Sequence, residues 1–245
     1  MKRSSGAPAS EAPRFPSPLI KPCASRNLED MSWIFAVFLT LWQTAPPSVP
    51  SLNAVVDGVD RTFARMHDFS ADFVQIQQNS LNQKQQGVGH LYLMRPRKAR
   101  YEYAKPEEQL FVSDGKNTYF YIPADKQVQK STIRDSFDDR IPLMFLVGQS
   151  NLRGEFTSFE RLSTPPEIEG TMVIRMHPKR KTDLTDLTME VEPQSYLIRR
   201  LELTRSDGTK FEFRLSNIRV NSGLKSDLFD FKIPSGVRVV EGIGQ

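Results

Sequence analysis

The sequence predicts a mainly β protein with an α lid: an incomplete, strongly curved antiparallel β-barrel of about eleven strands, covered by short helices. From residue 69 onward, apolar and polar residues alternate with the period of two that is typical of strands. Short turns separate the alternating segments, and Asp114-Gly115 and Ser206-Asp-Gly208 are typical of tight hairpins. Because parallel neighbours would need crossovers of a dozen or more residues, we expect antiparallel pairing.

The expected strands leave the direction of their side chains open. In chain order they cover residues 69–74, 88–95, 99–104, 109–113, 118–122, 126–133, 156–162, 171–176, 187–191, 195–204 and 210–217, followed by a last extended segment at 230–240. Residues 77–86, which are rich in glutamine and asparagine, are interpreted as a turn. On the strand 88–95 both sets of alternate residues are partly apolar, so alternation alone does not show which set points inward.

Two segments interrupt the strand pattern and are expected to cover the sheet. In residues 52–66 apolar side chains recur at helical spacing, which predicts an amphipathic helix. In residues 135–150 an intense apolar run lies between Pro142, suited to a first helical turn, and Gly148, suited to a helix end. We expect both segments to lie over the concave face and to leave an apolar hollow beneath a movable lid. Periodicity is also compatible with a concave face that side chains fill completely.

The first fifty residues are expected to precede the domain. Residues 1–30 are rich in Pro, Ser and Ala and lack a hydrophobic period, which is typical of disorder. Residues 33–42 form an apolar run about half as long as a bilayer requires, with basic residues before it, as in a signal peptide. We therefore expect export, with residues 51–245 as a single domain. Met1 and Met31 are both candidate start codons, the cleavage site is poorly defined, and an uncleaved anchor is the alternative.

Charge and cysteine content exclude several classes of protein. The chain has 33 basic and 29 acidic residues, and both signs alternate along the domain, whereas nucleic-acid binders carry a basic stripe. We therefore expect no nucleic-acid partner. The single cysteine, Cys23, precedes the domain, so we expect a mature protein without disulfides or thiol chemistry.

The sequence lacks the patterns that accompany catalysis. Its three histidines, His67, His90 and His177, have no His or Cys partner at metal-binding spacing. Nucleophile-elbow, phosphate-loop and dinucleotide motifs are absent from the sequence. The adjacent carboxylates Asp138 and Asp139 are more typical of an exposed turn or helix end than of an acid–base pair. We expect no enzymatic activity, no metal and no cofactor.

Eight short motifs follow one another along residues 52–241. They are Phe69-Ser-Ala-Asp-Phe-Val-Gln75, Gly89-His-Leu-Tyr-Leu-Met-Arg95-Pro96, Tyr101-Glu-Tyr103, Val112-Ser-Asp-Gly-Lys116, Tyr119-Phe-Tyr-Ile-Pro123, Gln127-Val128, Pro142-Leu-Met-Phe-Leu-Val-Gly148 and Phe231-Lys-Ile-Pro-Ser-Gly-Val237. Each motif is weak alone, but the eight in this order resemble the LolA family of periplasmic outer-membrane lipoprotein carriers.

The resemblance implies a chaperone that receives acylated lipoproteins from an inner-membrane ABC transporter and passes them to an outer-membrane acceptor lipoprotein, where one is present. It implies that Arg95 reaches from the sheet to the lid helices as a latch, and that Leu91 and Leu93 face inward with it. We expect a periplasmic monomer. The candidate lipid-binding residues are Phe73, Leu91, Leu93, Tyr101, Tyr103, Leu143, Phe145 and Leu146.

The sequence departs from the family pattern at Ala99, where an aromatic residue is common, and at Tyr101, where Trp is frequent. A small residue at position 99 is expected to enlarge the hollow or to loosen the lid. Two alternatives use the same fold. One is a periplasmic sensor that binds misfolded lipoproteins or a partner domain, and the other is a carrier of free lipids such as glycolipids.

Overall fold

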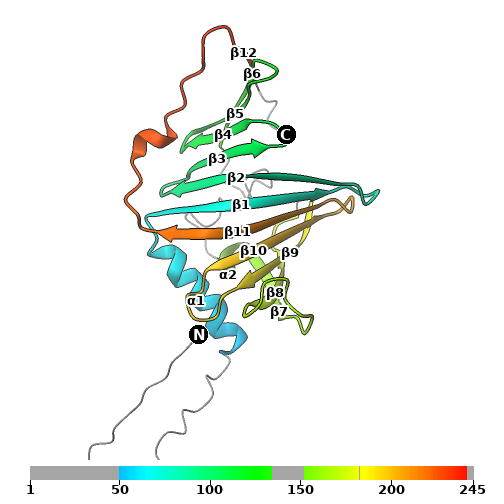
Figure 1. The fold of residues 1–245 in the computed structure, drawn as a ribbon. Helices are drawn as coiled ribbons and strands as arrows, with labels where there is room; N and C mark the ends of the chain where they lie inside the picture. Colours follow the sequence, from blue (N-terminus) through cyan, green and yellow to red (C-terminus); the bar gives the residue numbers. More distant parts are fainter. Residues whose placement is uncertain (1–49, 134–151, 182, 242–245) are drawn as a thin grey trace, which may run out of the picture. The chain divides into compact units, whose positions relative to one another are not determined.

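A single large sheet dominates the computed structural model, which describes residues 50–133, 152–181 and 183–241. Twelve strands in these ranges form the sheet in the order β12-β6-β5-β4-β3-β2-β1-β11-β10-β9-β8-β7 (Figure 1). The edge strands β12 and β7 do not pair with each other, so the sheet does not close into a barrel. This confirms the incomplete, curved β architecture that the sequence predicts. The expected signal peptide and the expected lid at 135–150 lie outside the described residues.

The strands and helices have the following bounds. The strands are β1 Asp68–Gln78, β2 Lys84–Met94, β3 Lys98–Lys105, β4 Gln109–Asp114, β5 Asn117–Ile122, β6 Gln127–Thr132, β7 Phe156–Arg161, β8 Met172–Pro178, β9 Leu184–Val191, β10 Ile198–Arg205, β11 Lys210–Val220 and β12 Arg238–Glu241. The helices are α1 Leu52–Ala64, α2 Leu152–Glu155 and the short 3-10 helix η2 Ser226–Phe229. Within the described ranges, none of these helices has the length and apolar content that crossing a membrane requires.

Two features of the sheet differ from the sequence prediction. Residues 77–86 are not a turn: β1 continues to Gln78 and β2 begins at Lys84, with Gln77 opposite Gln85 in an antiparallel register. The last extended segment becomes β12, which pairs with β6 in parallel rather than antiparallel orientation. The rule against parallel neighbours applies to strands joined by short turns, and β12 reaches β6 from a distant part of the chain.

The face of the sheet that α1 covers, called the inner face below, carries alternate residues of each strand. On β2, Leu91 and Leu93 point to the inner face and are fully buried. His90, which precedes Leu91 and points to the other face, is exposed. This confirms the inward direction that the family resemblance implied for Leu91 and Leu93. On β1 the inward residues begin with Phe69, Ala71 and Phe73, all of which belong to the hydrophobic core.

Helix α1 forms where the sequence predicts a helix, and it packs on the inner face. Ser51 caps its first turn, because the Ser51 Oγ accepts a hydrogen bond from the Ala54 N–H at 3.2 Å. Its buried side chains join one core cluster with inward residues of β1–β3 and β8–β11; they are Val55, Val56, Val59 and Phe63. Gly58 permits this close approach, because a Cβ there would lie 2.2 Å from the Cδ1 of Tyr196.

The segment between β11 and β12, residues 221–237, crosses the opposite, outer face and is called the C-terminal strap. The Arg100 Nη1 donates a hydrogen bond to the Leu228 carbonyl at 3.2 Å. The Phe231 ring lies 5.4 Å from the ring of Tyr119 and 5.9 Å from that of Tyr121. Figure 1 shows this orange-to-red segment running from β11 to β12. The strap therefore supports β3–β5 from the outer face.

Asp68 anchors the start of the strap. Its carboxylate accepts hydrogen bonds from the Ser222 N–H at 2.8 Å, the Ser222 hydroxyl at 3.0 Å and the Gly223 N–H at 3.0 Å. Burial alone would raise the pKa of Asp68, but these hydrogen bonds outweigh it and lower the pKa below its usual value. The ionised carboxylate therefore stabilises the folded chain.

The first prediction concerns the pH dependence of this anchor. A carboxyl group with a lowered folded-state pKa contributes stability that is present above its unfolded pKa of about 3.9 and is lost as pH falls through the folded value. We expect Asp68→Asn to lower the free energy of unfolding at pH 7 by about 1–3 kcal/mol. Urea unfolding of both proteins between pH 7 and pH 3 should show the difference shrinking below about pH 4. A difference that stays constant over this range would contradict the assignment.

Candidate functional site

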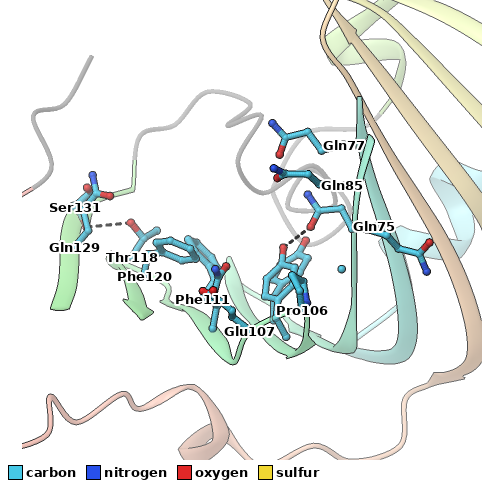
Figure 2. A pocket seen from close by; sticks show the side chains of 15 residues that line it. Gln75, Gln77, Gln85, Pro106, Glu107, Phe111, Thr118, Phe120, Gln129 and Ser131 are labelled. Carbon is cyan, nitrogen blue, oxygen red and sulfur yellow. Dashed lines mark hydrogen bonds between the residues drawn. The ribbon is translucent and has the colours of Figure 1, made fainter. Parts of the chain in front are cut away.

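A cavity of about 830 Å³ opens on the inner face of β1–β6 (Figure 2). Its volume lies within the roughly 300–1,000 Å³ that is typical of ligand sites. Aromatic side chains and glutamines supply most of the lining, together with one acidic and a few small residues. The described lining residues are Gln75, Gln77, Gln85, Gln86, Gly87, Tyr101, Tyr103, Pro106, Glu107, Gln109, Phe111, Thr118, Phe120, Gln129 and Ser131.

The strand register aligns three aromatic residues across the bottom of this cavity. Tyr101 on β3 pairs with Phe111 on β4, and Phe111 pairs with Phe120 on β5. The rings of Tyr101 and Phe111 meet edge to face, with centroids 5.9 Å apart and an interplanar angle of 80°. Directly paired residues of neighbouring strands point to the same face, so all three rings lie on the cavity side of the sheet, with Phe111 and Phe120 partly exposed and Tyr101 almost completely buried. These residues are called the aromatic floor.

Phe73 joins the cavity to the packed core. It is 2% exposed, and its ring lies edge-on to the rings of Tyr101, at 5.9 Å, and Tyr103, at 5.0 Å. Gly89, the β2 partner of Phe73, leaves room for this cluster. A Cβ at Gly89 would lie 1.9 Å from the Glu102 carbonyl oxygen and 3.0 Å from Phe73 Cζ. The absence of a side chain at Gly89 thus allows β2, β3 and Phe73 to approach one another.

Three inward glutamines at the β1–β2 hairpin form the other side of the cavity, and they are called the glutamine wall: Gln75, Gln77 and Gln85. Figure 2 shows them on the β1–β2 side, facing across the cavity toward Phe111 and Phe120. The Tyr103 hydroxyl donates a hydrogen bond to the Gln75 Oε1 at 2.7 Å. Burial raises the pKa of Tyr103 well above its usual value, so the phenol is a neutral donor at physiological pH.

The residues that the sequence analysis singled out fall into three groups. Tyr101 and Tyr103 line the cavity, and Phe73 packs directly behind them. Leu91 and Leu93 are fully buried in the core cluster, away from the described cavity lining. The other three candidates, Leu143, Phe145 and Leu146, lie outside the described residues. Lipid binding by all of these residues stays a prediction.

Ala99 was expected to change the size of the hollow or the closure of the lid. It is fully buried in the core and is not among the described residues that line the cavity. Within the described residues Ala99 is part of the packed core, and its expected effect on the hollow or on the lid stays a prediction.

Arg95, the expected latch, connects β2 to the end of α1. Its Nη2 donates a hydrogen bond to the Phe63 carbonyl oxygen at 2.8 Å. This carbonyl lies in the last turn of α1, where a cation also interacts favourably with the helix dipole. Burial lowers the pKa of Arg95, but a guanidinium group stays charged at neutral pH. The contact joins the sheet to the first of the two covering segments that the sequence predicted.

The glutamine wall and two of the three floor residues, Phe111 and Phe120, were not predicted from the sequence. Interpreting residues 77–86 as a turn removed Gln77 and Gln85 from the sheet. The signal was present in β1, where continuing the inward alternation from Phe73 by two and by four residues reaches Gln75 and Gln77.

A second hollow, of about 420 Å³, lies on the outer face around Asp72 and His90. Its polar groups bond to one another: Asp72 Oδ1 lies 2.5 Å from His90 Nδ1, and Asp72 Oδ2 accepts a hydrogen bond from Asn217 Nδ2 at 2.6 Å. The described part of the chain contains no group of three or more His, Cys, Asp and Glu placed to hold a metal. The larger inner cavity is therefore the candidate functional site.

Comparisons with known proteins give consistent results. The family model described as "Outer membrane lipoprotein carrier protein LolA" matches residues 64–232. The outer-membrane lipoprotein carrier protein of Haemophilus influenzae is 30% identical, with 72% of this chain and 82% of the relative covered. Its counterpart from Azotobacter vinelandii is 29% identical, with 79% of this chain and 88% of the relative covered.

A crystal structure of a LolA superfamily protein from Nitrosomonas europaea is also similar to the chain. The two are 8% identical and superpose with a TM-score of 0.41, over 74% of this chain and 98% of the other.

The second prediction tests the close approach at Gly89. We expect Gly89→Ala to lower the free energy of unfolding by about 1–3 kcal/mol, because the new methyl group meets the Glu102 carbonyl and Phe73. Gly87→Ala is the matched control, since its methyl group would meet the Tyr103 ring at 3.3 Å and no described atom closer. Urea unfolding followed by circular dichroism measures both. Equal losses in the two variants would show that Gly89 has no special packing role.

Proposed function

Because the chain belongs to the LolA family of outer membrane lipoprotein carrier proteins, we propose that it carries acylated lipoproteins through the periplasm by holding their acyl chains in the inner cavity. The observation that carries this proposal is the aromatic floor. Phe111 and Phe120 are partly exposed and present apolar surface in the cavity, beside Tyr101, which is 2% exposed and belongs to the packed core. An alkyl chain can cover this surface without displacing core side chains.

The energetics of acyl burial favour a shallow site. Burying a methylene group contributes about 0.8 kcal/mol, so one chain of about fifteen methylenes could gain roughly 12 kcal/mol. Non-covalent affinity saturates near 18–21 kcal/mol, so a site that buried two or three chains completely would not release them on a useful timescale. A carrier needs incomplete burial. A cavity with the aromatic floor on one side and the polar amides of the glutamine wall on the other would bury an acyl chain incompletely.

The family role extends this proposal to partners. The carrier would receive lipoproteins from an inner-membrane ABC transporter and deliver them to an outer-membrane acceptor, where the cell has one. Its action would be transfer without chemical change, so the chain would be a chaperone rather than an enzyme. Export would rely on the N-terminal signal peptide expected within residues 1–50, and residues 51–245 would form the carrier domain.

The decisive experiment is mass spectrometry of lipid that co-purifies with the exported protein from its native periplasm. A bound lipoprotein N-terminus supports the proposal. Free lipid would favour a glycolipid or other lipid carrier, and a protein without bound lipid would favour a sensor that uses the same fold.

The third prediction tests the aromatic floor. We expect Phe120→Ser to weaken binding of a fluorescent acylated peptide by about tenfold, because apolar contact area is lost. Tyr121→Ser is the matched control, since Tyr121 is adjacent on β5 but faces the C-terminal strap on the outer face. Fluorescence titration of both variants gives the two dissociation constants. The same loss in both would argue against binding at the floor.

The fourth prediction concerns Arg95. Its charged hydrogen bond to Phe63 is worth about 1.5–3 kcal/mol and favours the cargo-free arrangement of α1. We expect Arg95→Leu to bind lipoprotein but to transfer it poorly, because the contact that opposes the loaded state is gone. Arg95→Lys, which keeps the charge, should transfer at an intermediate rate. A reconstituted assay of transfer to acceptor membranes measures all three proteins, and normal transfer by Arg95→Leu would refute the latch.

A further inference from the structure

The glutamine wall gives the cavity a polar side that alkyl chains do not require. Gln75 and Gln77 follow Phe73 on the inward face of β1, and Gln85 lies directly opposite Gln77 on β2. Each side chain ends in an amide that can both donate and accept hydrogen bonds and that carries no net charge. The wall therefore offers directional contacts to a neutral polar group that lies within reach of the aromatic floor.

The contact with Tyr103 orients the most buried of these amides. The Tyr103 hydroxyl donates to the Gln75 Oε1 at 2.7 Å, which places the carbonyl end of the amide toward β3. Because Tyr103 is neutral, it serves here as the donor, and the Nε2 hydrogens of Gln75 remain to donate to an acceptor. Gly87, the β2 partner of Gln75, keeps the space beside this amide clear, with the Tyr103 ring as its nearest side-chain neighbour.

Cargo binding changes what these amides need. In the empty cavity, water can satisfy them. When an acyl chain lies on the floor and excludes water, each covered amide must find another partner, because a buried polar group without a hydrogen bond is strongly disfavoured. An alkyl chain offers no such partner. The carbonyl oxygens of the ester or amide groups that attach the chains to their head do.

We propose that the glutamine wall binds the ester and amide carbonyls of the ligand while the attached chains lie on the aromatic floor. This inference rests on the proposed carrier function and defines its substrate class as fatty acyl esters and amides. An acylated lipoprotein N-terminus and a free glycerolipid share this chemistry. None of the described lining residues is basic, and the one charged residue, the exposed Glu107, is acidic. The lining therefore offers no cationic partner to a lipid phosphate, which favours the uncharged diacylglyceryl head of a lipoprotein.

The test compares two synthetic peptides that begin with a lipidated cysteine. In one, two chains are attached to the glycerol through esters, and in the other, two chains of equal length are attached through ethers, which lack carbonyl oxygens. We expect the full-length protein to bind the ester peptide about five- to tenfold more tightly, a ratio that corresponds to about one hydrogen bond. In the double variant Gln75→Leu/Gln85→Leu the ratio should fall to about one.

Gln78→Leu is the matched control. Gln78 is also on β1, but it is outside the described cavity lining and its Nε2 donates to Asn82 Oδ1 at 2.8 Å. This variant should keep the ester preference of the unmodified protein. Circular dichroism and thermal unfolding verify that each variant is folded, and the ester-to-ether ratio within one variant is insensitive to a general loss of active protein.

The outcomes separate this inference from the carrier function. If the unmodified protein binds both peptides with equal affinity, carbonyl recognition is overturned and the carrier function stands. If it binds neither peptide, the carrier function itself fails. Phosphatidylglycerol vesicles provide the last comparison: weaker competition than that of the unlabelled ester peptide supports the lipoprotein head as the ligand, and equal competition overturns that choice of head.

Discussion

The whole site depends on the change in side-chain character along the inward face of β1. The inward positions are Phe69, Ala71 and Phe73, followed by Gln75 and Gln77. The first three are buried in the core cluster to which α1 contributes, whereas Gln77 at the hairpin end is exposed. Because strand side chains alternate strictly, this order divides the inner face into a packed half and an open half at the boundary between residues 73 and 75. An inner face that was apolar along its whole length would favour collapse or association of the open half.

The division also fits the proposed carrier function, which requires that an acyl chain be buried incompletely. The side chains of the packed half contact one another in a single core cluster, so its packing is complete without a ligand. In the open half, the partly exposed rings of Phe111 and Phe120 are the apolar part of the cavity, and the amides of the glutamine wall lie opposite them. If acyl chains bind here as proposed, the polar amides limit the affinity in addition to the shape of the cavity.

The sequence predicted those parts of the fold that local patterns determine. Helical spacing predicted α1 and alternation predicted most strands, because the period of the apolar residues shows which side of each element is buried in the core. Gln77 and Gln85 were missed because glutamine in a polar run is typical of a turn, whereas pairing with the rest of the sheet keeps these residues extended. The parallel pairing of β12 with β6 depends on a contact between distant residues, which no local pattern records. The cavity itself was located only when the register aligned Tyr101 with Phe111.

The free energies of side-chain burial and of the Arg95 hydrogen bond show how firmly α1 is attached to the sheet. Its four buried side chains, Val55, Val56, Val59 and Phe63, together contribute about 6–12 kcal/mol of burial, whereas the Arg95 hydrogen bond contributes about 1.5–3 kcal/mol. Breaking the Arg95 contact therefore cannot release the helix from the core. The contact joins the last turn of α1, at Phe63, to the end of β2 that is farther from Gln85. Because the Phe63 side chain is itself buried in the core, this hydrogen bond affects how firmly the end of α1 is joined to β2 rather than whether the helix stays packed.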